Sequence, residues 1–157
     1  MAGGPTGPHS LLDGLPRTDD MAAAASVETG IQVRFRDVDS MHHVNNAVYA
    51  TYLEQARAAF YDEVVGEPLT DVDTVLVTLT IDYRAPIELG DRVTVTVEVP
   101  ELGESAIPME YEITLEDGTV AATAETVQVA FDREEGTSRP IPEAWRQAIE
   151  SNHATTG

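Results

Sequence analysis

Hydrophobic and polar residues alternate along most of this chain, and the alternation predicts a series of β-strands. The first expected strand begins at Ile31, where Ile31, Val33 and Phe35 alternate with polar residues. This period of two is typical of a half-buried strand. Four later segments alternate in the same way, with apolar positions at Val75, Val77, Leu79, Ile81 and Tyr83; Val93, Val95, Val97 and Val99; Ile107, Met109, Tyr111, Ile113 and Leu115; and, within residues 120–131, Val127, Val129 and Phe131. The pair Asp117 and Gly118 predicts a hairpin turn before the last of them.

A helical period replaces the alternation between residues 47 and 65. This segment contains no glycine or proline, and its apolar residues recur on one helical face at Tyr49, Leu53, Ala56, Phe60 and Val64. Asn45 or Asn46 is a suitable N-cap, and Gly66 a suitable C-cap. A second, short helix is expected after Pro142.

The order of elements predicts an α+β fold. Consecutive antiparallel strands with one apolar face need a cover, and residues 47–65 form the only long helix available. We therefore expect a five-stranded antiparallel curved sheet wrapped around one long central helix, with a polar outer sheet face. The domain is expected over residues 31–150, with mobile tails at residues 1–30 and 151–157.

Composition narrows the protein class. A chain of 157 residues is the usual size of one domain. No apolar run approaches the roughly 20 residues that cross a membrane, and the first thirty residues lack the pattern of a signal peptide. The chain has no cysteine, so a disulfide framework and a thiolate nucleophile are excluded. A cytoplasmic location is the default expectation.

The charge is strongly negative and unusually distributed. Twenty-eight acidic residues face nine basic ones, giving a net charge of −19, and all nine basic residues are arginine. Such a surface repels nucleic acid and anionic membranes, so neither is an expected partner. Dense acidity without lysine resembles proteins of salt-accumulating organisms, and we interpret it as halophilic adaptation.

Candidate chemistry is concentrated in the ten residues between the first expected strand and the helix. Residues 37–46 contain two carboxylates, two histidines and two asparagines: Asp37, Asp39, His42, His43, Asn45 and Asn46. They precede a helix N-terminus, where unpaired N–H groups and the helix dipole stabilise developing negative charge. Acyl transfer needs such donors for the carbonyl oxygen and a carboxylate that attacks it or activates water.

The same stretch resembles a known family. The run from Val33 to Tyr49, continued by Tyr52-Leu53-Glu54-Gln55-Ala56-Arg57, resembles the 4-hydroxybenzoyl-CoA thioesterase family of hotdog proteins. Its core HVNNAVY is also similar to that of acyl-acyl-carrier-protein thioesterases. The resemblance covers residues 31–149 and includes the run DYRAPIELGD at residues 82–91.

The resemblance implies a hotdog fold and hydrolysis of an acyl-CoA or related thioester without a metal or other cofactor. It also implies a homodimer or homotetramer with active sites at the subunit interface. By position, Asp39 matches the catalytic carboxylate, acting as nucleophile or general base. Asn46 matches the backbone N–H that polarises the carbonyl, and His43 a histidine that orients substrate or water. Met41 departs from the plant-type carrier-protein enzymes, which have a catalytic asparagine here.

Several residues have a structural alternative. Asp39 could form an Asx-turn or a helix cap, and His43 could be structural. Asp37 is expected to be a turn residue or a partner of Arg34 or Arg36 rather than a second catalytic acid. Glu54 and Arg57, three residues apart on the helix, are expected to form an ion pair.

Binding of polyanionic coenzyme A to so acidic a chain requires a local cluster of arginines. Some of the following are expected to meet near the pocket mouth: Arg34, Arg36, Arg57, Arg84, Arg92 and Arg133. We take Arg84 and Arg57, with Tyr49 as an acyl-pocket residue, as the substrate-binding candidates.

Neither EF-hand nor HExxH spacing is present, so no catalytic metal is expected. Two other functions stay open beside an acyl-CoA thioesterase: a non-catalytic acyl-CoA-binding hotdog protein and an acyl-carrier-protein thioesterase. A hotdog hydratase is disfavoured, because its motifs place Asp and His differently.

Overall fold

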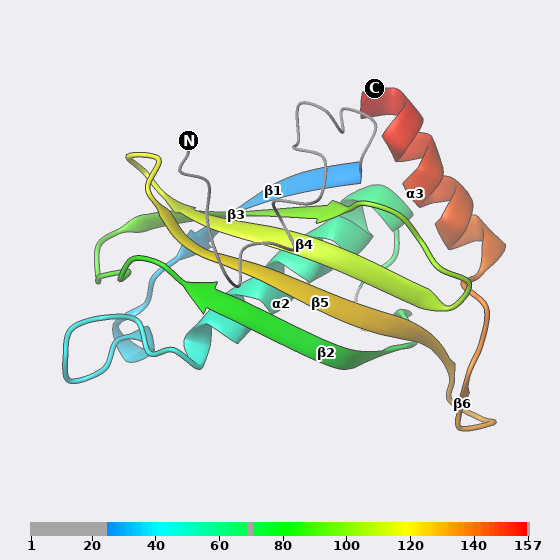
Figure 1. Ribbon diagram of the computed structural model, residues 1–157, viewed down its shortest axis with the longest axis horizontal. Helices are drawn as coiled ribbons and strands as arrows, with labels where there is room; N and C mark the ends of the chain where they lie inside the picture. Colours follow the sequence, from blue (N-terminus) through cyan, green and yellow to red (C-terminus); the bar gives the residue numbers. More distant parts are fainter. Residues whose placement is uncertain (1–24, 69–70, 157) are drawn as a thin grey trace.

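A curved antiparallel sheet with a helix on its concave side forms the body of the protein in a computed structural model, which describes residues 25–68 and 71–156. Helix α2 lies behind the sheet in Figure 1, and helix α3 stands at one end. The strands are β1 (Ala25–Gln32), β2 (Thr74–Tyr83), β3 (Arg92–Val99), β4 (Ala106–Leu115), β5 (Val120–Asp132) and the short β6 (Thr137–Ser138). This is the arrangement expected from the sequence, with a two-residue sixth strand added to the predicted five.

The strands follow the order β1-β3-β4-β5-β2, and every neighbouring pair is antiparallel. β6 pairs only with the end of β5. Strands β1 and β2 are therefore the two edges of the main sheet. In Figure 1, β2 lies along the lower edge.

The predicted helix at residues 47–65 divides into two parts. Helix α2 spans Val48–Phe60, and the chain then widens into one π-helical turn, η3 (Tyr61–Val65). Gly66 ends the turn with a positive φ of 85° and donates its N–H to the Tyr61 carbonyl oxygen. The left-handed conformation favours glycine, which explains the predicted C-cap.

The two sheet faces differ as expected. The concave face and the inner side of α2 supply one hydrophobic core, whose largest fully buried side chains include Tyr52, Tyr61, Phe60, Leu53, Ile107, Met109 and Ile113. Cross-strand pairing places Thr80, Glu125, Glu110 and Glu98 in one row on the other face. The predicted polar residues lie on the outer face, but the apolar alternation of β5 marked the wrong side. Thr126, Gln128 and Ala130 are buried against the core, whereas Val127 and Val129 lie on the outer face.

The beginning of the chain corrects one prediction. β1 starts at Ala25, so residues 25–30 belong to the sheet rather than to a tail. Their inward positions are Ala25, Val27 and Thr29, whose weak hydrophobicity hid the alternation. Phe35 was expected to continue the strand; it lies instead in a 3-10 turn, η2 (Phe35–Asp37), with its side chain 81% exposed. The rest of the predicted tail, residues 1–24, lies outside the described residues.

Strand β2 corrects a second prediction. Its register with β5 shifts between Leu76 and Thr78. The bulge puts Leu76, Leu79, Ile81 and Tyr83 on the concave face, because their cross-strand partners lie there. Val75 is opposite Val129 on the outer face, so the predicted common face of Val75, Val77 and Leu79 is wrong.

At the C-terminal end, helix α3 spans Glu143–Thr156 and packs near η3 and β1. It continues past residue 150, where the domain was expected to end. Trp145 anchors it, edge-on to Tyr61 with ring centroids 6.3 Å apart. No helix in the described part of the chain is long and apolar enough to cross a membrane.

Candidate active site

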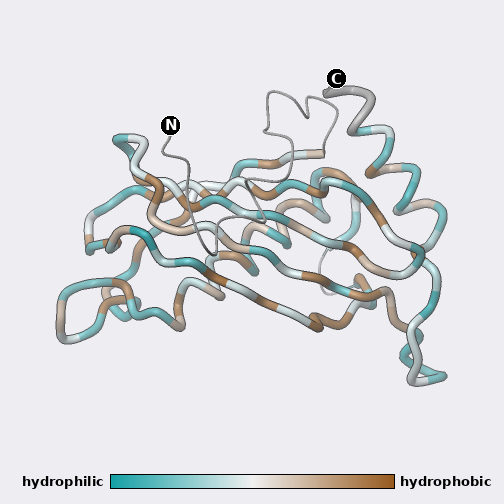
Figure 2. Tube along the Cα trace, in the orientation of Figure 1, coloured by the Kyte–Doolittle hydropathy of each residue, from teal (hydrophilic) through white to brown (hydrophobic). Residues whose placement is uncertain are grey.

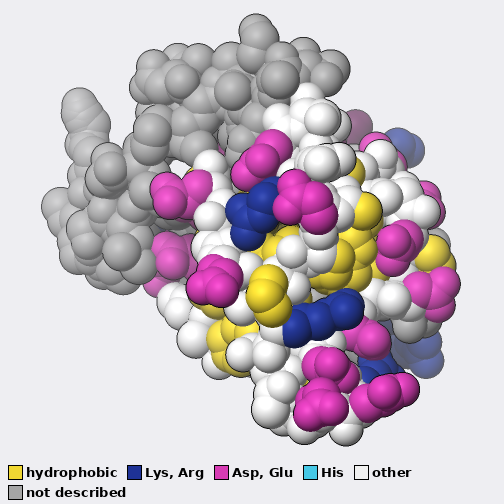
Figure 3. Space-filling model, turned by 90° about the vertical axis from the view of Figure 1, so that its right-hand side faces the viewer, with side chains coloured by type: hydrophobic (Ala, Val, Ile, Leu, Met, Phe, Trp, Pro, Cys, Tyr) yellow, Lys and Arg dark blue, Asp and Glu magenta, His cyan; other side chains and the backbone are white. Residues whose placement is uncertain are grey.

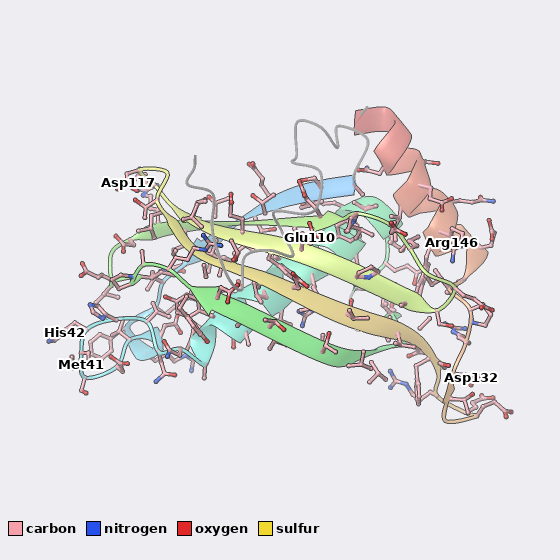
Figure 4. All side chains as sticks on the ribbon, viewed as in Figure 1. Met41, His42, Glu110, Asp117, Asp132 and Arg146 are labelled. Carbon is pink, nitrogen blue, oxygen red and sulfur yellow. The ribbon has the colours of Figure 1, made fainter. Side chains whose placement is uncertain are left out.

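The loop that carries Asp39 closes on itself. Val38 and Val44 form an isolated antiparallel bridge at its base. Above it, the Asp39 N–H donates to the His43 carbonyl oxygen and the His42 N–H to the Asp39 carbonyl oxygen, both at 2.9 Å. His42 has a positive φ of 67°, a conformation for which histidine is among the more tolerant residues. Met41 and His42 form the exposed tip, at the left of Figure 4.

The Asp39 side chain forms an Asx-turn within this loop. Its Oδ1 accepts the Met41 N–H at 2.9 Å, the local role that aspartate commonly plays in turns. Among the described residues Oδ2 has no hydrogen-bond partner, and the side chain is exposed. One carboxylate oxygen therefore shapes the loop, and the other is free to meet a substrate or a water.

Asp37 fixes the base of the loop. It is only 2% exposed; its Oδ2 accepts the Arg34 N–H and the Tyr52 hydroxyl, both at 2.9 Å. The Arg34 guanidinium lies 3.4 Å from Oδ1. Burial alone would raise the Asp37 pKa, but these hydrogen bonds and the Arg34 charge outweigh it and lower the pKa. The expected pairing of Asp37 with Arg34 is confirmed.

The N-terminus of α2 presents one free backbone donor next to the loop. The Asn45 side chain accepts the Ala47 N–H at 2.9 Å in a local turn. The N-cap of α2 is Ala47, which has no side-chain cap hydrogen bond, so the predicted N-cap at Asn45 or Asn46 is wrong. The next two N–H groups, of Val48 and Tyr49, donate to the carbonyl oxygens of Asn45 and Asn46. Within the described ranges, the Asn46 N–H has no partner. It is the predicted donor to a substrate carbonyl oxygen.

A small cavity of about 250 Å³ opens beside this N-terminus. Its lining comes from the end of the loop, the start of α2 and the segment after β2: His43, Val44, Asn46, Tyr49, Tyr83, Arg84, Ala85 and Pro86. The Tyr83 hydroxyl donates to the Asn46 carbonyl oxygen at 2.9 Å, and its ring meets Tyr49 edge-on with centroids 4.8 Å apart. His43 Nε2 lies 3.8 Å from Glu88 Oε2.

The structure brings four predicted site residues to this cavity, namely His43, Asn46, Tyr49 and Arg84. Asp39 does not line it, although its backbone is hydrogen-bonded to His43. Tyr83 is a site residue that the sequence analysis placed only on a strand face. Its position within the family-like run at residues 82–91 was the available signal.

Among the described residues, Arg84 is the one arginine of the predicted set that lines the cavity, so the expected cluster is not seen there. Arg84 lines the cavity and donates to Thr123 Oγ1 at 3.2 Å. Arg34 is held by Asp37, and Arg133 binds Asp73 Oδ1 at 2.7 Å. Arg57 is buried between α2 and the sheet, where it donates to the Tyr111 hydroxyl. The expected Glu54–Arg57 ion pair is absent from the described residues, since Glu54 is exposed on another side of α2.

No group of three or more His, Asp or Glu side chains in the described ranges is arranged to hold a metal ion. The cavity instead combines a free backbone N–H, an arginine and two tyrosines. A free N–H beside a carboxylate loop is suited to polarise a carbonyl and to activate its attacker.

Comparisons with known proteins agree with this chemistry. Residues 33–149 match the model of the thioesterase-like superfamily. The long-chain acyl-CoA thioesterase FadM of Escherichia coli (strain K12) is 34% identical over 110 residues, covering 68% of this chain and 83% of that protein. The 1,4-dihydroxy-2-naphthoyl-CoA hydrolase of Synechocystis sp. is 32% identical over 75 residues, covering 47% and 54%.

A solved structure is similar over nearly its whole length. The crystal structure of a thioesterase from Thermus thermophilus, complexed with coenzyme A and Zn, is 35% identical, with a TM-score of 0.74. The match covers 84% of this chain and 95% of that one.

Proposed function

This chain belongs to the thioesterase-like superfamily, and on that premise we propose that it is an acyl-CoA thioesterase acting at the N-terminus of α2. The reaction adds water to an acyl thioester and releases a carboxylic acid and a free thiol. One observation supports the proposal: within the stretch that matches the family, the Asn46 N–H lies beside the Asp39 loop and has no partner among the described residues. The two parts needed for acyl transfer thus come from one short segment.

In the proposed mechanism, the substrate carbonyl oxygen accepts the Asn46 N–H. The positive end of the α2 dipole then stabilises the negative charge that develops on this oxygen. Asp39 acts through Oδ2 by one of two routes. As a general base it removes a proton from the attacking water. As a nucleophile it forms an acyl anhydride that water later hydrolyses. In both routes the C–S bond breaks and the thiolate leaves and gains a proton.

Arg84 and Tyr49 are the proposed substrate contacts at this point. The cavity that they line is smaller than most ligand pockets, which measure roughly 300–1,000 Å³. It therefore suits the thioester end of a substrate rather than a whole acyl-CoA molecule. His43, on the same wall, is the proposed orienting residue for substrate or water.

A homodimer is the proposed form of the enzyme. β2 is a ten-residue edge strand with exposed apolar side chains along its length, at Val75, Leu76, Val77, Leu79 and Tyr83. Figure 2 shows hydrophobic segments along this lower edge of the molecule. A long apolar edge is a template for pairing with another strand. Pairing with a second copy would bring the partner to the open side of the Tyr83 cavity and enclose it.

A thiol-release assay tests the enzymatic proposal. Wild-type protein and Asp39→Asn are compared on a series of acyl-CoA substrates. The substituted amide retains an oxygen for the Met41 N–H but lacks a basic or strongly nucleophilic group. We expect kcat to fall by about 10²- to 10⁴-fold, as for loss of a central acid-base group.

Asp62→Asn, a substitution of an exposed acid on η3, is the matched control and should retain wild-type kcat. If the wild-type protein hydrolyses none of the acyl-CoA substrates, the enzymatic proposal is wrong. Tight acyl-CoA binding without turnover would favour the non-catalytic binding protein. Activity on acyl-acyl-carrier-protein alone would favour a carrier-protein thioesterase.

A further inference from the structure

Tyr83, the last residue of β2, reaches across to the turn that begins helix α2 (Figure 1). Its hydroxyl donates to the Asn46 carbonyl oxygen at 2.9 Å. Asn46 is also the residue whose N–H the proposed mechanism directs at the substrate carbonyl. Tyr83 therefore binds the backbone of the proposed oxyanion donor, although it lies 37 residues further along the chain.

The turn around Asn46 is exposed and weakly held by the helix that follows it. Among the described residues, Ala47, the N-cap of α2, has no side-chain cap hydrogen bond. The Asn46 carbonyl oxygen accepts the Tyr49 N–H at 3.3 Å, which is long for a bond between backbone groups. The Tyr83 hydroxyl adds a shorter bond to the same oxygen, and this bond comes from the sheet. It therefore ties the turn to the rigid body of the protein.

The backbone of Tyr83 is itself firmly anchored. It pairs with Ala122 of β5, and the next two N–H groups along the chain donate to the Ala121 carbonyl oxygen, at 2.8 and 3.1 Å. The Tyr83 ring is half-exposed, but its edge contact with Tyr49, at 4.8 Å between centroids, is made to a ring that is only 3% exposed. The hydroxyl is thus presented to Asn46 from a fixed strand end and against a buried ring.

The position of an oxyanion donor decides how much it stabilises the transition state. The donor must lie roughly 2.7–3.1 Å from the place that the oxyanion will occupy. A displacement of about 1 Å can lower the rate about 100-fold. A backbone N–H in an exposed turn moves with the turn, so a hydroxyl that holds the carbonyl of the same residue limits this displacement before the substrate arrives.

We propose that Tyr83 is a positioning residue of the active site: its hydroxyl holds the Asn46 carbonyl oxygen and so keeps the Asn46 N–H directed at the substrate carbonyl. This inference rests on the proposed thioesterase function for the identity of that carbonyl. Because the hydroxyl acts on the thioester group, its effect is the same for every acyl chain. A residue that only lines the pocket would instead change affinity, by an amount that depends on the acyl group.

The kinetic test compares Tyr83→Phe with the wild type on butyryl-CoA, decanoyl-CoA and benzoyl-CoA. The substitution removes the hydroxyl but retains the ring that packs on Tyr49 and the apolar edge of β2. On each substrate that the wild type hydrolyses, kcat should fall about 10- to 100-fold, while KM should change by less than about threefold. A loss confined to KM, or a loss of kcat that differs more than about tenfold among the acyl groups, would make Tyr83 a pocket-lining residue and overturn the inference.

Tyr61→Phe is the matched control. It also removes one tyrosine hydroxyl, which donates to Gln128 Oε1 at 2.8 Å, from a residue that does not line the cavity. This variant should lower the melting temperature, because its hydroxyl bond is buried, and leave kcat and KM unchanged. Thermal melting also establishes that Tyr83→Phe is folded, so that its loss of kcat is not a loss of stability.

Nuclear magnetic resonance relaxation provides a readout that does not require turnover. The order parameter of the Asn46 N–H should be that of a rigid backbone, about 0.85, in the wild type and should fall toward about 0.6 in Tyr83→Phe. An equal order parameter in both proteins, or an unchanged kcat in Tyr83→Phe, would overturn the inference and leave the thioesterase function intact. Absence of wild-type turnover on every thioester would contradict the proposed function, and the relaxation measurement would still decide whether Tyr83 fixes the Asn46 backbone.

Discussion

Two aspartates separated by one residue have different environments, and the difference fits the different roles proposed for them. Asp37 is buried and accepts hydrogen bonds from Arg34 and Tyr52. Asp39 is exposed, and among the described residues only one of its oxygens is used. A carboxylate saturated with hydrogen bonds is a poor base, whereas one with a free oxygen can act on a substrate. Asp37 is thus the structural acid of the pair.

The Asp37 carboxylate should make stability depend on acid pH. Despite its burial, its folded-state pKa is lowered by the Arg34 and Tyr52 hydrogen bonds, while its unfolded value is about 3.9. The stabilisation is therefore complete above pH of about 4 and is lost as pH falls through the lower folded-state pKa. Asp37→Asn should cost about 1–3 kcal/mol at pH 7.

Urea unfolding of wild type and Asp37→Asn between pH 7 and pH 2 measures this effect. The difference in unfolding free energy should shrink as the solution becomes acidic. Asp62→Asn, at an exposed position, should show no such convergence. A difference that stays constant with pH would contradict the assigned ionisation of Asp37.

Local sequence patterns predicted the roles of some individual residues but not of others. The Gly66 C-cap was predictable, because a left-handed C-cap depends on the few residues around a helix end. Arg57 was not, since its partner Tyr111 lies 54 residues further along the chain. Its spacing to Glu54 predicted a surface ion pair, and only the packing of α2 on the sheet buries it. The contact of Tyr83 with the start of α2 could not be predicted either, because the sequence does not show which strand lies next to the helix.

Among the elements, the β2 edge carries the clearest prediction. Val77, at the bulge, is 53% exposed, and a lysine there should oppose strand pairing. Val77→Lys should convert a dimer into monomer at micromolar concentration, measured by sedimentation velocity. Leu89→Lys, at a 50% exposed position outside β2, is the control and should remain dimeric. A wild-type protein that sediments as a monomer would contradict the proposed dimer.

The elements themselves were largely readable from the sequence. β3 and β4 alternate strongly, because one face of each strand meets the core and the other meets solvent. β5 does not, because it turns Thr126 and Gln128 to the core and Val127 and Val129 outward. The strand prediction failed where the inward side chains are weakly hydrophobic or where a bulge interrupts the alternation. Thr29 and Ala25 mark the inner face of β1 too faintly, and the bulge after Leu76 reverses the phase of β2. The π-helical turn of η3 has the same apolar spacing as an α-helix over so short a length.

On the scale of the whole molecule, negative charge is the dominant property. Figure 3 shows arginines and carboxylates interspersed at the end formed by β6 and α3. On the outer sheet face, three carboxylates, Glu98, Glu110 and Glu125, occupy one row across three neighbouring strands. Burial, and then the neighbouring Asp82, raise the Glu125 pKa. Like charges opposite each other in a sheet are destabilising.

Added salt should therefore stabilise the protein. Raising NaCl from about 0.05 M to about 1 M shortens the screening length to about 3 Å and weakens this repulsion. The melting temperature should rise with salt, and sucrose at equal osmolality should give a smaller increase. Glu125→Gln should raise stability at low salt by about 0.2–1 kcal/mol and reduce the salt response. Glu116→Gln, on the exposed hairpin, is the control; a melting temperature that does not change with salt would contradict the prediction.

The closure of the loop between Val38 and Val44 has a practical consequence for engineering. Because the bridge and the backbone hydrogen bonds of Asp39, His42 and His43 define its shape, the loop behaves as an exchangeable module. The exposed side chain of Met41 can be varied in a library without altering the frame that presents Asp39. Position 42 is the exception, since its left-handed backbone restricts the useful choices to glycine, asparagine, aspartate and histidine. New acyl or carrier preferences could be selected at this tip while the Asp39 carboxylate stays in place.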